Sequence, residues 1–389
     1  MPKAIFLLDH FWGERSGGAE WQTFVLCRAL REIGWEIHYL AESLTGKTGS
    51  TQELQGIVVH WLPPLQWRSR FHSSQRRLYH VVERILADLQ PDILYSRGNN
   101  CFTGIGVCHR ARRQRKLKTV WGAAADWEIS NDFYRQVLRS SRKPLWKKAL
   151  LWPDMRIKDW DHAAEIAQAD CVIVQTEQQA QLVRQRFQRE SVRVPSSHEI
   201  PPDPDFKSSP PVAIFVAHIG RRKRVELFVE LARRCLDIPA SFLIIGDFAD
   251  ASYEQEIRRT TVGIKNLQYH GPASAEESNR QIARATILVS TTEPGREGYP
   301  NVFIQAWLRK TLVVTLDHDP DGVIGQNPFL GRRAGNLEGL VASARLLLAD
   351  PAGNKAMGDA ARQWAIQHHG YESNRERIAN VFGSLIISK

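Results

Sequence analysis

"VPSSHEIPPDPDFKSSPP", Val194 to Pro211, divides the sequence into two halves. Six prolines and four serines in these eighteen residues predict a linker rather than a helix or a strand. The full chain has 389 residues, which is more than one hydrophobic core usually spans. We therefore expect two domains, residues 1–200 and 201–370, followed by a C-terminal helix over 371–389 that packs back towards the first domain.

Short apolar runs alternate with helical patterns on both sides of this linker. Before it, "KAIFLL" (3–8) and "EIHYLAE" (36–42) have the length and composition of strands, and "WQTFVLCRALREIG" (21–34) spaces its apolar residues at three and four. After it, the strand-like "VAIFVAHIG" (212–220) precedes the helix-like "VELFVELARRCL" (225–236). This alternation predicts right-handed βαβ units and parallel sheets. We expect an α/β fold of two Rossmann-like domains that face each other across a cleft and bind ligands at the carboxyl ends of their strands.

Composition excludes several classes of protein. The apolar share of 43% and the charged share of 24% are ordinary for a soluble globular chain. No run approaches the roughly 20 apolar residues of a membrane span. Asp9 cuts the apolar start short, so we expect a first strand there rather than a signal peptide. Five cysteines without a CxxC pair favour a reducing compartment and no metal site, and we expect a cytoplasmic protein.

The net charge of +10 is concentrated in one segment. From His60 to Trp160 there are 20 Lys and Arg against 8 Asp and Glu, together with seven of the twelve tryptophans. Basic residues mixed with Trp and Leu fit an anionic membrane surface, and they also fit nucleic acid or a solvated basic face. No readout motif for nucleic acid accompanies the charge, so we expect no such partner. We expect peripheral contact with an anionic membrane, with the solvated face as the alternative.

A second informative stretch is "EPGREGYPNVFIQAW", Glu293 to Trp307. It begins as a loop rich in glycine and proline and becomes an apolar, helix-like run. The start of a helix offers unpaired N–H groups that suit a phosphate. Glu297, on the loop, would instead face hydroxyl groups or a developing positive charge. A ligand that carries both phosphates and hydroxyl groups is a sugar nucleotide, and this stretch predicts such a ligand.

Four stretches resemble family 4 of the retaining glycosyltransferases, which have the two-domain GT-B fold, and they occur in the same order as in that family. The most specific is "EGYPNVFIQAW" (297–307), which continues to "LVVTLDHDPDGVIG" (312–325). The others are "SGGAEWQTFVLCRALREIGWEIHYLAE" (16–42), "IFVAHIGRRKRVELFVELA" (214–232), and "LIIGDF" (243–248) with "LQYHGPASAEESNRQIARATILVSTT" (267–292). The resemblance spans most of the chain and implies both the fold and the activity of a sugar transferase.

The resemblance assigns roles to two catalytic residues. Lys223 stands where the family has its diphosphate-binding lysine, and a fixed cation there would stabilise the leaving group as the glycosidic bond breaks. Glu297 stands at the first acid of the family's glutamate pair, which binds hydroxyl groups of the donor sugar and stabilises an oxocarbenium-like transition state. The alternatives are one more surface cation for Lys223 and a helix-capping acid for Glu297.

The same resemblance implies a wider donor site. Gly17 and Gly18 would let the first loop approach the phosphates or the sugar closely, although a structural turn would also favour glycine. The residues that follow Glu297 would place backbone groups near the sugar: Gly298, Tyr299, Pro300 and Asn301.

Two positions depart from the family pattern. Gln305 replaces the second glutamate, which usually contacts the ribose, and an amide can still pair with a ribose hydroxyl. His218 replaces the arginine that usually accompanies the diphosphate lysine, and a histidine is fully charged only in acidic solution. Arg221, Arg222 or Arg224 would supply the missing cation. These departures concern catalytic efficiency and the choice of donor more than the fold.

The acceptor side is less defined by the sequence. Asp126 and Arg97 follow two predicted strands and are candidates to bind the acceptor, and each would otherwise cap or pair at a sheet edge. The helix-like "KPLWKKALLW" (143–152) is a candidate contact with a lipid-linked acceptor at a membrane.

The resemblance thus implies a retaining hexosyltransferase of bacterial envelope or exopolysaccharide synthesis. It would move a sugar from a nucleoside-diphosphate sugar to a glycan or a lipid-linked saccharide. We expect no cofactor and no divalent metal, because Lys223 and a helix start would take the place of a metal at the diphosphate. One rival hypothesis is a GT-B epimerase or phosphorylase, for which we find no second acid or cofactor lysine. Another is a non-catalytic protein that binds sugar nucleotides or glycans, and His218 and Gln305 favour this hypothesis.

Overall fold

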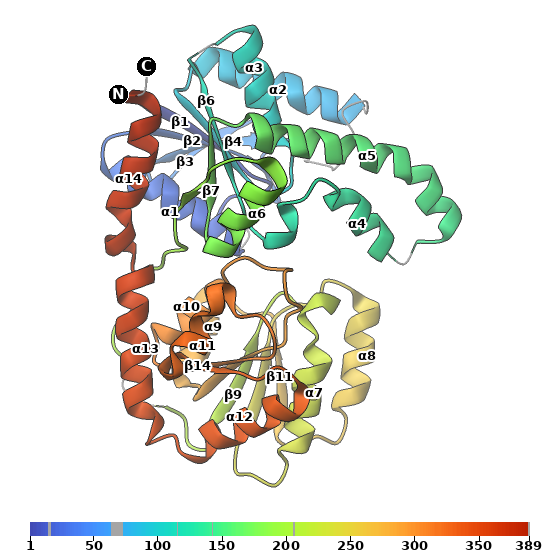
Figure 1. The fold of residues 1–389 in the computed structure, drawn as a ribbon, viewed down its shortest axis with the longest axis vertical. Helices are drawn as coiled ribbons and strands as arrows, with labels where there is room; N and C mark the ends of the chain where they lie inside the picture. The colour runs from blue at the N-terminus through green and yellow to red at the C-terminus, as the bar shows by residue number, and fades with distance from the viewer. Residues whose placement is uncertain (15–16, 64–72, 115, 142, 205–206, 388–389) are drawn as a thin grey trace. The chain divides into compact units, whose positions relative to one another are not determined.

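The chain folds into two compact units in a computed structural model that describes residues 1–14, 17–63, 73–114, 116–141, 143–204 and 207–387, leaving aside the side chains of 73–77. Unit 1 comprises Met1–Ser196 and Asn374–Lys389, and unit 2 comprises Ser197–Ser373 (Figure 1). Each unit contains a largely parallel sheet with helices, which confirms the predicted α/β class. Trp67 and the other predicted basic-segment residues between 64 and 72 lie outside the described residues.

Unit 1 is built on an eight-stranded sheet in the order β3-β4-β2-β1-β5-β6-β7-β8. Its strands are β1 (Lys3–Leu7), β2 (Glu36–Glu42), β3 (Thr51–Leu54), β4 (Ile57–Leu62), β5 (Ile93–Arg97), β6 (Lys118–Gly122), β7 (Cys171–Val174) and β8 (Val192–Arg193). Its helices are α1 (Gly18–Glu32), α2 (Ser73–Leu89), α3 (Phe102–Arg112), α4 (Phe133–Ser140), α5 (Leu145–Gln168), α6 (Glu177–Phe187) and most of α14 (Tyr371–Ile387). The central strands are buried along their length, as expected of parallel strands covered on both faces.

The edge strand β3 was not predicted from the sequence. It pairs antiparallel with β4 through the two-residue loop of Gln55 and Gly56, whose φ angles are 53° and 73°. Two positive φ angles are typical of a type I′ hairpin turn. The signal in the sequence was the glycine between two short β-type runs.

The C-terminal helix α14 completes the core of unit 1. Its Phe382 is fully buried and lies with its ring centroid 6.1 Å from that of Phe6 and 6.2 Å from that of Tyr95. Trp35, just after α1, contacts the same ring edge-on. The last helix therefore packs on elements that the first hundred residues supply.

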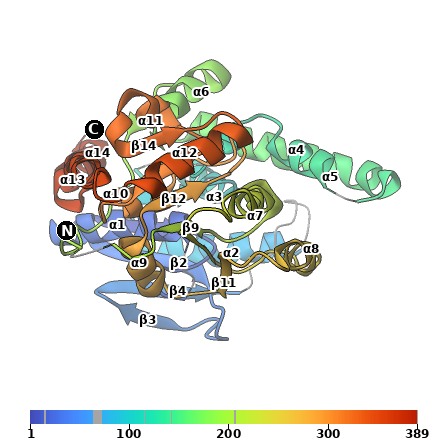
Figure 2. The same cartoon turned by 90° about the horizontal axis from the view of Figure 1, so that it is seen from below.

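Helices α4 and α5 form a hairpin that projects from the rest of unit 1 (Figures 1 and 2). Asp159 of α5 accepts hydrogen bonds from the backbone N–H of Tyr134, at 2.7 Å, and from Arg135 Nε, at 2.5 Å. This buried carboxylate therefore caps the start of α4 and fixes which face of α5 turns inward. Among the described residues, no helix has the length and apolar character needed to cross a membrane.

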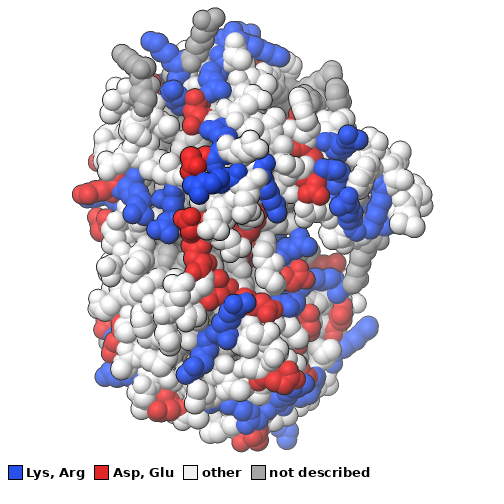
Figure 3. Space-filling view, viewed as in Figure 1, with Lys and Arg blue, Asp and Glu red and all other residues white. Residues whose placement is uncertain are grey.

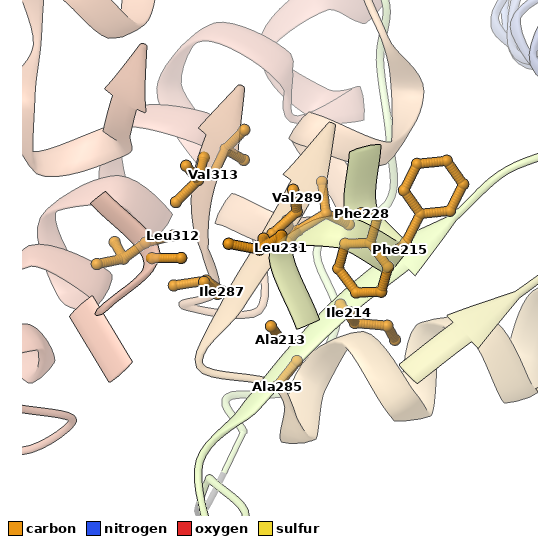
Figure 4. Packing of buried hydrophobic residues seen from close by; sticks show 14 of the residues in the cluster. Ala213, Ile214, Phe215, Phe228, Leu231, Ala285, Ile287, Val289, Leu312 and Val313 are labelled. Atoms are coloured by element: carbon orange, nitrogen blue, oxygen red, sulfur yellow. The ribbon is translucent and has the colours of Figure 1, made fainter. Parts of the chain in front are cut away.

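Unit 2 is built on a six-stranded parallel sheet in the order β11-β10-β9-β12-β13-β14. Its strands are β9 (Val212–Val216), β10 (Ser241–Ile245), β11 (Leu267–Gly271), β12 (Ile287–Ser290), β13 (Leu312–Thr315) and β14 (Gly331–Arg333). Its helices are α7 (Val225–Arg234), α8 (Ala251–Thr261), α9 (Ala275–Arg284), α10 (Asn301–Trp307), α11 (Val323–Gln326), α12 (Leu337–Ala349) and α13 (Asn354–His369). Side chains of β9, β12 and β13 meet those of α7 in the core (Figure 4).

The predicted linker contains no helix or strand among its described residues, and it does not act as a free tether. Ser196, Ser197 and His198 are buried. Lys207 donates hydrogen bonds to the carbonyls of Ala283 and Arg309 and to a threonine hydroxyl, at 2.8 to 3.0 Å. The segment is irregular because of its prolines, but Lys207 anchors it to unit 2, and Ser196 accepts a hydrogen bond from Gln175 of unit 1 at 3.1 Å.

Candidate functional site

The two predicted catalytic residues meet at one point of unit 2. The strand order reverses between β9 and β12, and ligands of doubly wound sheets bind outside the carboxyl ends of the strands at such a switch point. Lys223 lies on the loop after β9, and Glu297 lies on the loop after β12. Lys223 Nζ contacts Glu297 Oε1, and the two side chains are only 15% and 19% exposed. Lys223 is therefore not one more exposed surface cation.

Burial changes the protonation of Lys223. Removal from water disfavours the ammonium form, and this effect, followed by repulsion from Arg222, lowers the pKa of Lys223 to about 7. A lysine with this pKa changes its charge near neutral pH, and a further anion, besides the Glu297 carboxylate that it already contacts, would favour its protonated form. The Lys223 amine can thus bind an anion and take up a proton when it does so.

The loop that carries Lys223 is fixed by residues for which the sequence analysis proposed another role or none. Arg224, at φ 50°, donates to the carbonyls of Thr291, at 2.6 Å, and Thr292, at 3.1 Å, and forms an ion pair with Asp317 at 3.0 Å. The hydroxyl of Thr291 donates in return to the carbonyl of Lys223 at 2.6 Å. Arg224 therefore joins the ends of β9, β12 and β13 instead of standing as a spare cation.

Two other predicted diphosphate contacts are engaged elsewhere. His218 Nδ1 lies 2.9 Å from Asp247 Oδ1, and both side chains are at least half exposed. Arg221 forms a 2.9 Å ion pair with Glu256, and its guanidinium lies 4.5 Å from the ring centroid of Tyr253. Both residues lie on the Lys223 loop, but neither contacts Glu297.

The residues that follow Glu297 are fixed by buried side chains. His318 Nε2 donates to the carbonyl of Gly298 at 3.0 Å, and burial lowers the pKa of this imidazole. Tyr299 is buried, and Pro300 precedes the first residue of α10, Asn301. The sequence analysis missed His318, although its place in "LDHDP" directly after β13 was a usable signal.

Helix α10 itself is seven residues long. Gln305 lies one turn after Asn301 on this helix and is partly exposed. Its side chain makes no hydrogen bond to the described part of the chain, so its amide remains available for a ligand.

Gly17 and Gly18 belong to unit 1. Gly17 is the N-cap of α1 with φ −135°, an extended conformation that any residue adopts. A side chain at this position would meet the carboxylate of Glu20, whose oxygen lies 2.1 Å from an ideal Cβ. The glycine therefore gives room to an acid in the first turn of the helix and is not required by a left-handed turn.

The two acceptor-side candidates also belong to unit 1, and both are buried. Asp126 accepts a hydrogen bond from Gln179 Nε2 at 3.0 Å. Arg97 ends β5 and lines a pocket together with Gln22, Ala123, Gln175 and Ser196. Three of these residues stand at or just after the ends of β5, β6 and β7, so the pocket lies at the carboxyl edge of this sheet.

One group of potential metal ligands occurs among the described residues. Atoms of Cys101, His162 and Glu165 lie within 4.8 Å of one another. The imidazole already uses both nitrogens: Nδ1 lies 3.0 Å from Glu165, and Nε2 donates to the carbonyl of Glu128 at 2.7 Å. Glu165 also accepts the N–H of Gly104 at the start of α3. Hydrogen bonding within the protein accounts for this cluster.

Sequence comparison assigns the family. Residues 16–195 match the family described as Glycosyltransferase Family 4, and residues 210–350 match Glycosyl transferases group 1. The two ranges together span most of the chain. The chain belongs to the family 4 glycosyltransferases. A comparison with curated proteins found no match.

Solved structures share the GT-B fold of this glycosyltransferase. Sucrose-phosphate synthase from Thermosynechococcus elongatus superposes with a TM-score of 0.79 at 15% identity over 100% of both chains. Anabaena HepE in complex with UDP-glucose gives 0.70 at 14% identity over 98% and 99% of the two chains. A mutant of S. aureus TarM in complex with fondaparinux, α-GlcNAc-glycerol and UDP gives 0.71 at 10% identity over 100% of both.

Proposed function

We propose that this glycosyltransferase moves a hexose from a nucleoside-diphosphate sugar to a glycan or a lipid-linked saccharide, with retention at the anomeric carbon, in polysaccharide synthesis. The contact between Lys223 and Glu297 at the switch point of unit 2 carries the proposal. This contact places Lys223, a cation that can bind phosphates, directly beside Glu297, an acid that can bind hydroxyl groups. The complexes of HepE with UDP-glucose and of TarM with UDP and sugars support a ligand of this class.

The donor would exchange the Lys223–Glu297 contact for its own groups. Lys223 would bind the diphosphate, and its charge would stabilise the leaving group without a divalent metal. Glu297 would accept hydrogen bonds from the donor sugar and stabilise positive charge on its ring as the glycosidic bond breaks. Gln305 would pair with the ribose. His318, by fixing the Gly298 carbonyl, would keep this loop in place.

The acceptor would be bound in unit 1 by Arg97 and Asp126. Support comes from their place at the carboxyl edge of the parallel sheet, where Arg97 ends β5 and Asp126 follows β6. Both residues are buried, so each could contact only a small part of the acceptor.

The test combines binding and product analysis. UDP-, GDP- and ADP-sugars are screened for thermal stabilisation, because a ligand at 100 times its dissociation constant adds about 2.7 kcal/mol of stability. The donor found is then incubated with oligosaccharide and lipid-linked acceptors, and the anomeric configuration of the product is read by NMR. A product with the donor's configuration is expected. Stabilisation without any transfer would identify a non-catalytic binder, and an inverted product would contradict retention.

The α4–α5 hairpin supports the membrane part of the proposal. Along α5, apolar residues recur at spacings of three and four on the side opposite buried Lys158, Asp159 and His162. Trp146 and Trp160, near the two ends of this stripe, are 65% and 62% exposed, and Leu150 is 73% exposed. We name this set the α5 stripe: Trp146, Ala149, Leu150, Pro153, Ile157 and Trp160.

Positive charge flanks the α5 stripe. Lys143 and Lys147 are exposed at its start, and Arg156 is exposed farther along the helix. Lys and Arg gather over this projection in the surface view (Figure 3). An apolar stripe with cations beside it fits the interface of an anionic bilayer, in which each Lys or Arg contributes about 1 kcal/mol. We propose that α5 docks on the inner face of the cell membrane, with the protein in the cytoplasm, to reach a lipid-linked acceptor.

Vesicle binding tests this docking. The protein should sediment with vesicles rich in phosphatidylglycerol and should ignore neutral phosphatidylcholine vesicles. Reversal of Lys143, Lys147 and Lys148 to Glu should weaken binding by more than about 100-fold, because three attractions become repulsions. A matched control reverses three exposed cations of unit 2, and we expect no comparable effect: Arg258, Arg259 and Lys265.

A second variant tests the apolar contribution to docking. Changing Trp146 and Leu150 to Ala should weaken vesicle binding without a change in charge, and transfer to a soluble acceptor should persist in every variant. Binding that ignores lipid charge, or a triple reversal that still docks, would leave α5 as a solvated basic face.

A further inference from the structure

The chain passes between the two units twice, and the two crossing segments are paired. We call residues 197–201 and 369–373 of unit 2 the crossing segments, since the unit boundaries fall at Ser196/Ser197 and Ser373/Asn374. His198 N–H donates to the carbonyl of His369 at 2.8 Å, and the N–H of Tyr371 donates to the carbonyl of His198 at 2.8 Å. These bonds form an isolated parallel bridge between His198 and Gly370.

The side chain of His198 reaches the loop that carries Glu297. His198 is 6% exposed, and its Nε2 donates to Asn301 Oδ1 at 2.9 Å. Burial lowers the pKa of His198 to about 4, so the ring is neutral near pH 7 and carries one proton. That proton is accounted for by the bond to Asn301, the first residue of α10.

A second contact joins the same loop to the other crossing segment. The ring centroid of Tyr299 lies 4.5 Å from that of His369, and Tyr299 and His369 are both buried. The residues that follow Glu297 are therefore attached to both crossing segments, through Asn301 on one side and Tyr299 on the other. All of these residues belong to unit 2.

We propose that His198 is a positioning residue of the donor site. It fixes Asn301, and with it the loop of Glu297, at a constant position relative to the paired crossing segments. The bridge supplies the rigid support, because its backbone bonds fix the Cα of His198 independently of the ring. The ring then holds the side chain of Asn301, which lies 103 residues farther along the chain, through the hydrogen bond from Nε2. Without it, Asn301 would lose one of the contacts that fix its side chain, and the affinity for the donor would fall by the cost of ordering that side chain on binding.

The proposal rests on the proposed function, so its test has one arm with a nucleotide sugar and one without. His198→Ala should raise the dissociation constant and the KM of the nucleotide sugar by about 10-fold, with kcat and acceptor KM changed less than about threefold. His198→Gln should restore most of this loss, because a glutamine amide N–H reaches the place of Nε2, and the shorter His198→Asn should not. Asn301→Ala combined with His198→Ala should cost no more than Asn301→Ala alone.

The arm without ligand uses hydrogen exchange on the free protein. His198→Ala should speed amide exchange at residues 298–304 and leave the sheet amides of β9 and β12 unchanged. His368→Ala, at an exposed histidine on the same helix as His369, is the control and should change neither arm. If the wild-type protein bound no nucleotide sugar, the proposed function would be refuted. The amide hydrogen exchange at residues 298–304 would then show by itself whether His198 fixes this loop. Unchanged exchange at 298–304, equal losses for donor and acceptor, or failure of glutamine to rescue would overturn the inference.

Discussion

Lys223 should take up a proton when the donor binds, and this follows from its burial. In the free protein the pKa of Lys223 is lowered to about 7, so at pH 8 only about one molecule in ten carries the charge that a diphosphate needs. A bound diphosphate raises this pKa again, because it stabilises the ammonium form. Binding should therefore take up about 0.9 proton at pH 8 and about 0.1 proton at pH 6.

The sign of the pH dependence is fixed by the same argument. The binding-competent, protonated form is nearly complete at pH 6, about half populated at pH 7 and lost above that, so affinity should fall towards about tenfold per pH unit above 7. The fall stops when the pH reaches the raised pKa of the complex.

Calorimetry in two buffers of different ionisation enthalpy measures this uptake. A nucleotide sugar is the right ligand, since its diphosphate is esterified at both ends and does not titrate near neutral pH. Lys223→Arg is the matched variant, because a guanidinium keeps its proton throughout this range. Burial lowers the pKa of the nearby His318, so in the free protein its imidazole is neutral at pH 8, and Lys223→Arg shows how much of the uptake belongs to Lys223. Uptake by Lys223→Arg equal to that of the wild type, or no uptake by the wild type at pH 8, would refute the reasoning.

Three further predictions concern the same site. Glu297→Ala should keep the fold and lower kcat by about 100-fold or more in the transfer assay, and normal turnover with only a raised KM would make Glu297 a binding group. Arg224→Ala should lower the free energy of unfolding in urea by about 1–3 kcal/mol, since it leaves Asp317 and two carbonyls without their donor, whereas Arg221→Ala should cost less than about 1 kcal/mol because its ion pair is exposed. Transfer should persist in EDTA and should not rise with added Mg²⁺ or Mn²⁺, and a loss of activity in EDTA that Mg²⁺ restores would contradict a metal-independent mechanism.

Local patterns determined the elements of this protein. Apolar runs such as "VAIFV" and "ILVS" became β9 and β12 because a strand buried on both faces needs a continuous apolar sequence. The same patterning predicted the two α/β sheets, and the motif around Glu297 predicted the family. These features depend on neighbours within a few residues, which is why sequence alone sufficed for them.

Tertiary structure decided which distant side chains meet. Lys223 and Glu297 are 74 residues apart, Arg224 and Asp317 are 93 apart, and His198 and Asn301 are 103 apart. Each pair is brought together by the order of strands in the unit 2 sheet or by the pairing of the crossing segments, and neither is encoded in hydrophobic periodicity. From the sequence, Arg224 was therefore predicted only as a possible replacement cation, and His198 only as part of the linker. The positions of β9, β12 and β13 side by side show that Arg224 joins their ends. The pairing of the crossing segments brings His198 to Asn301.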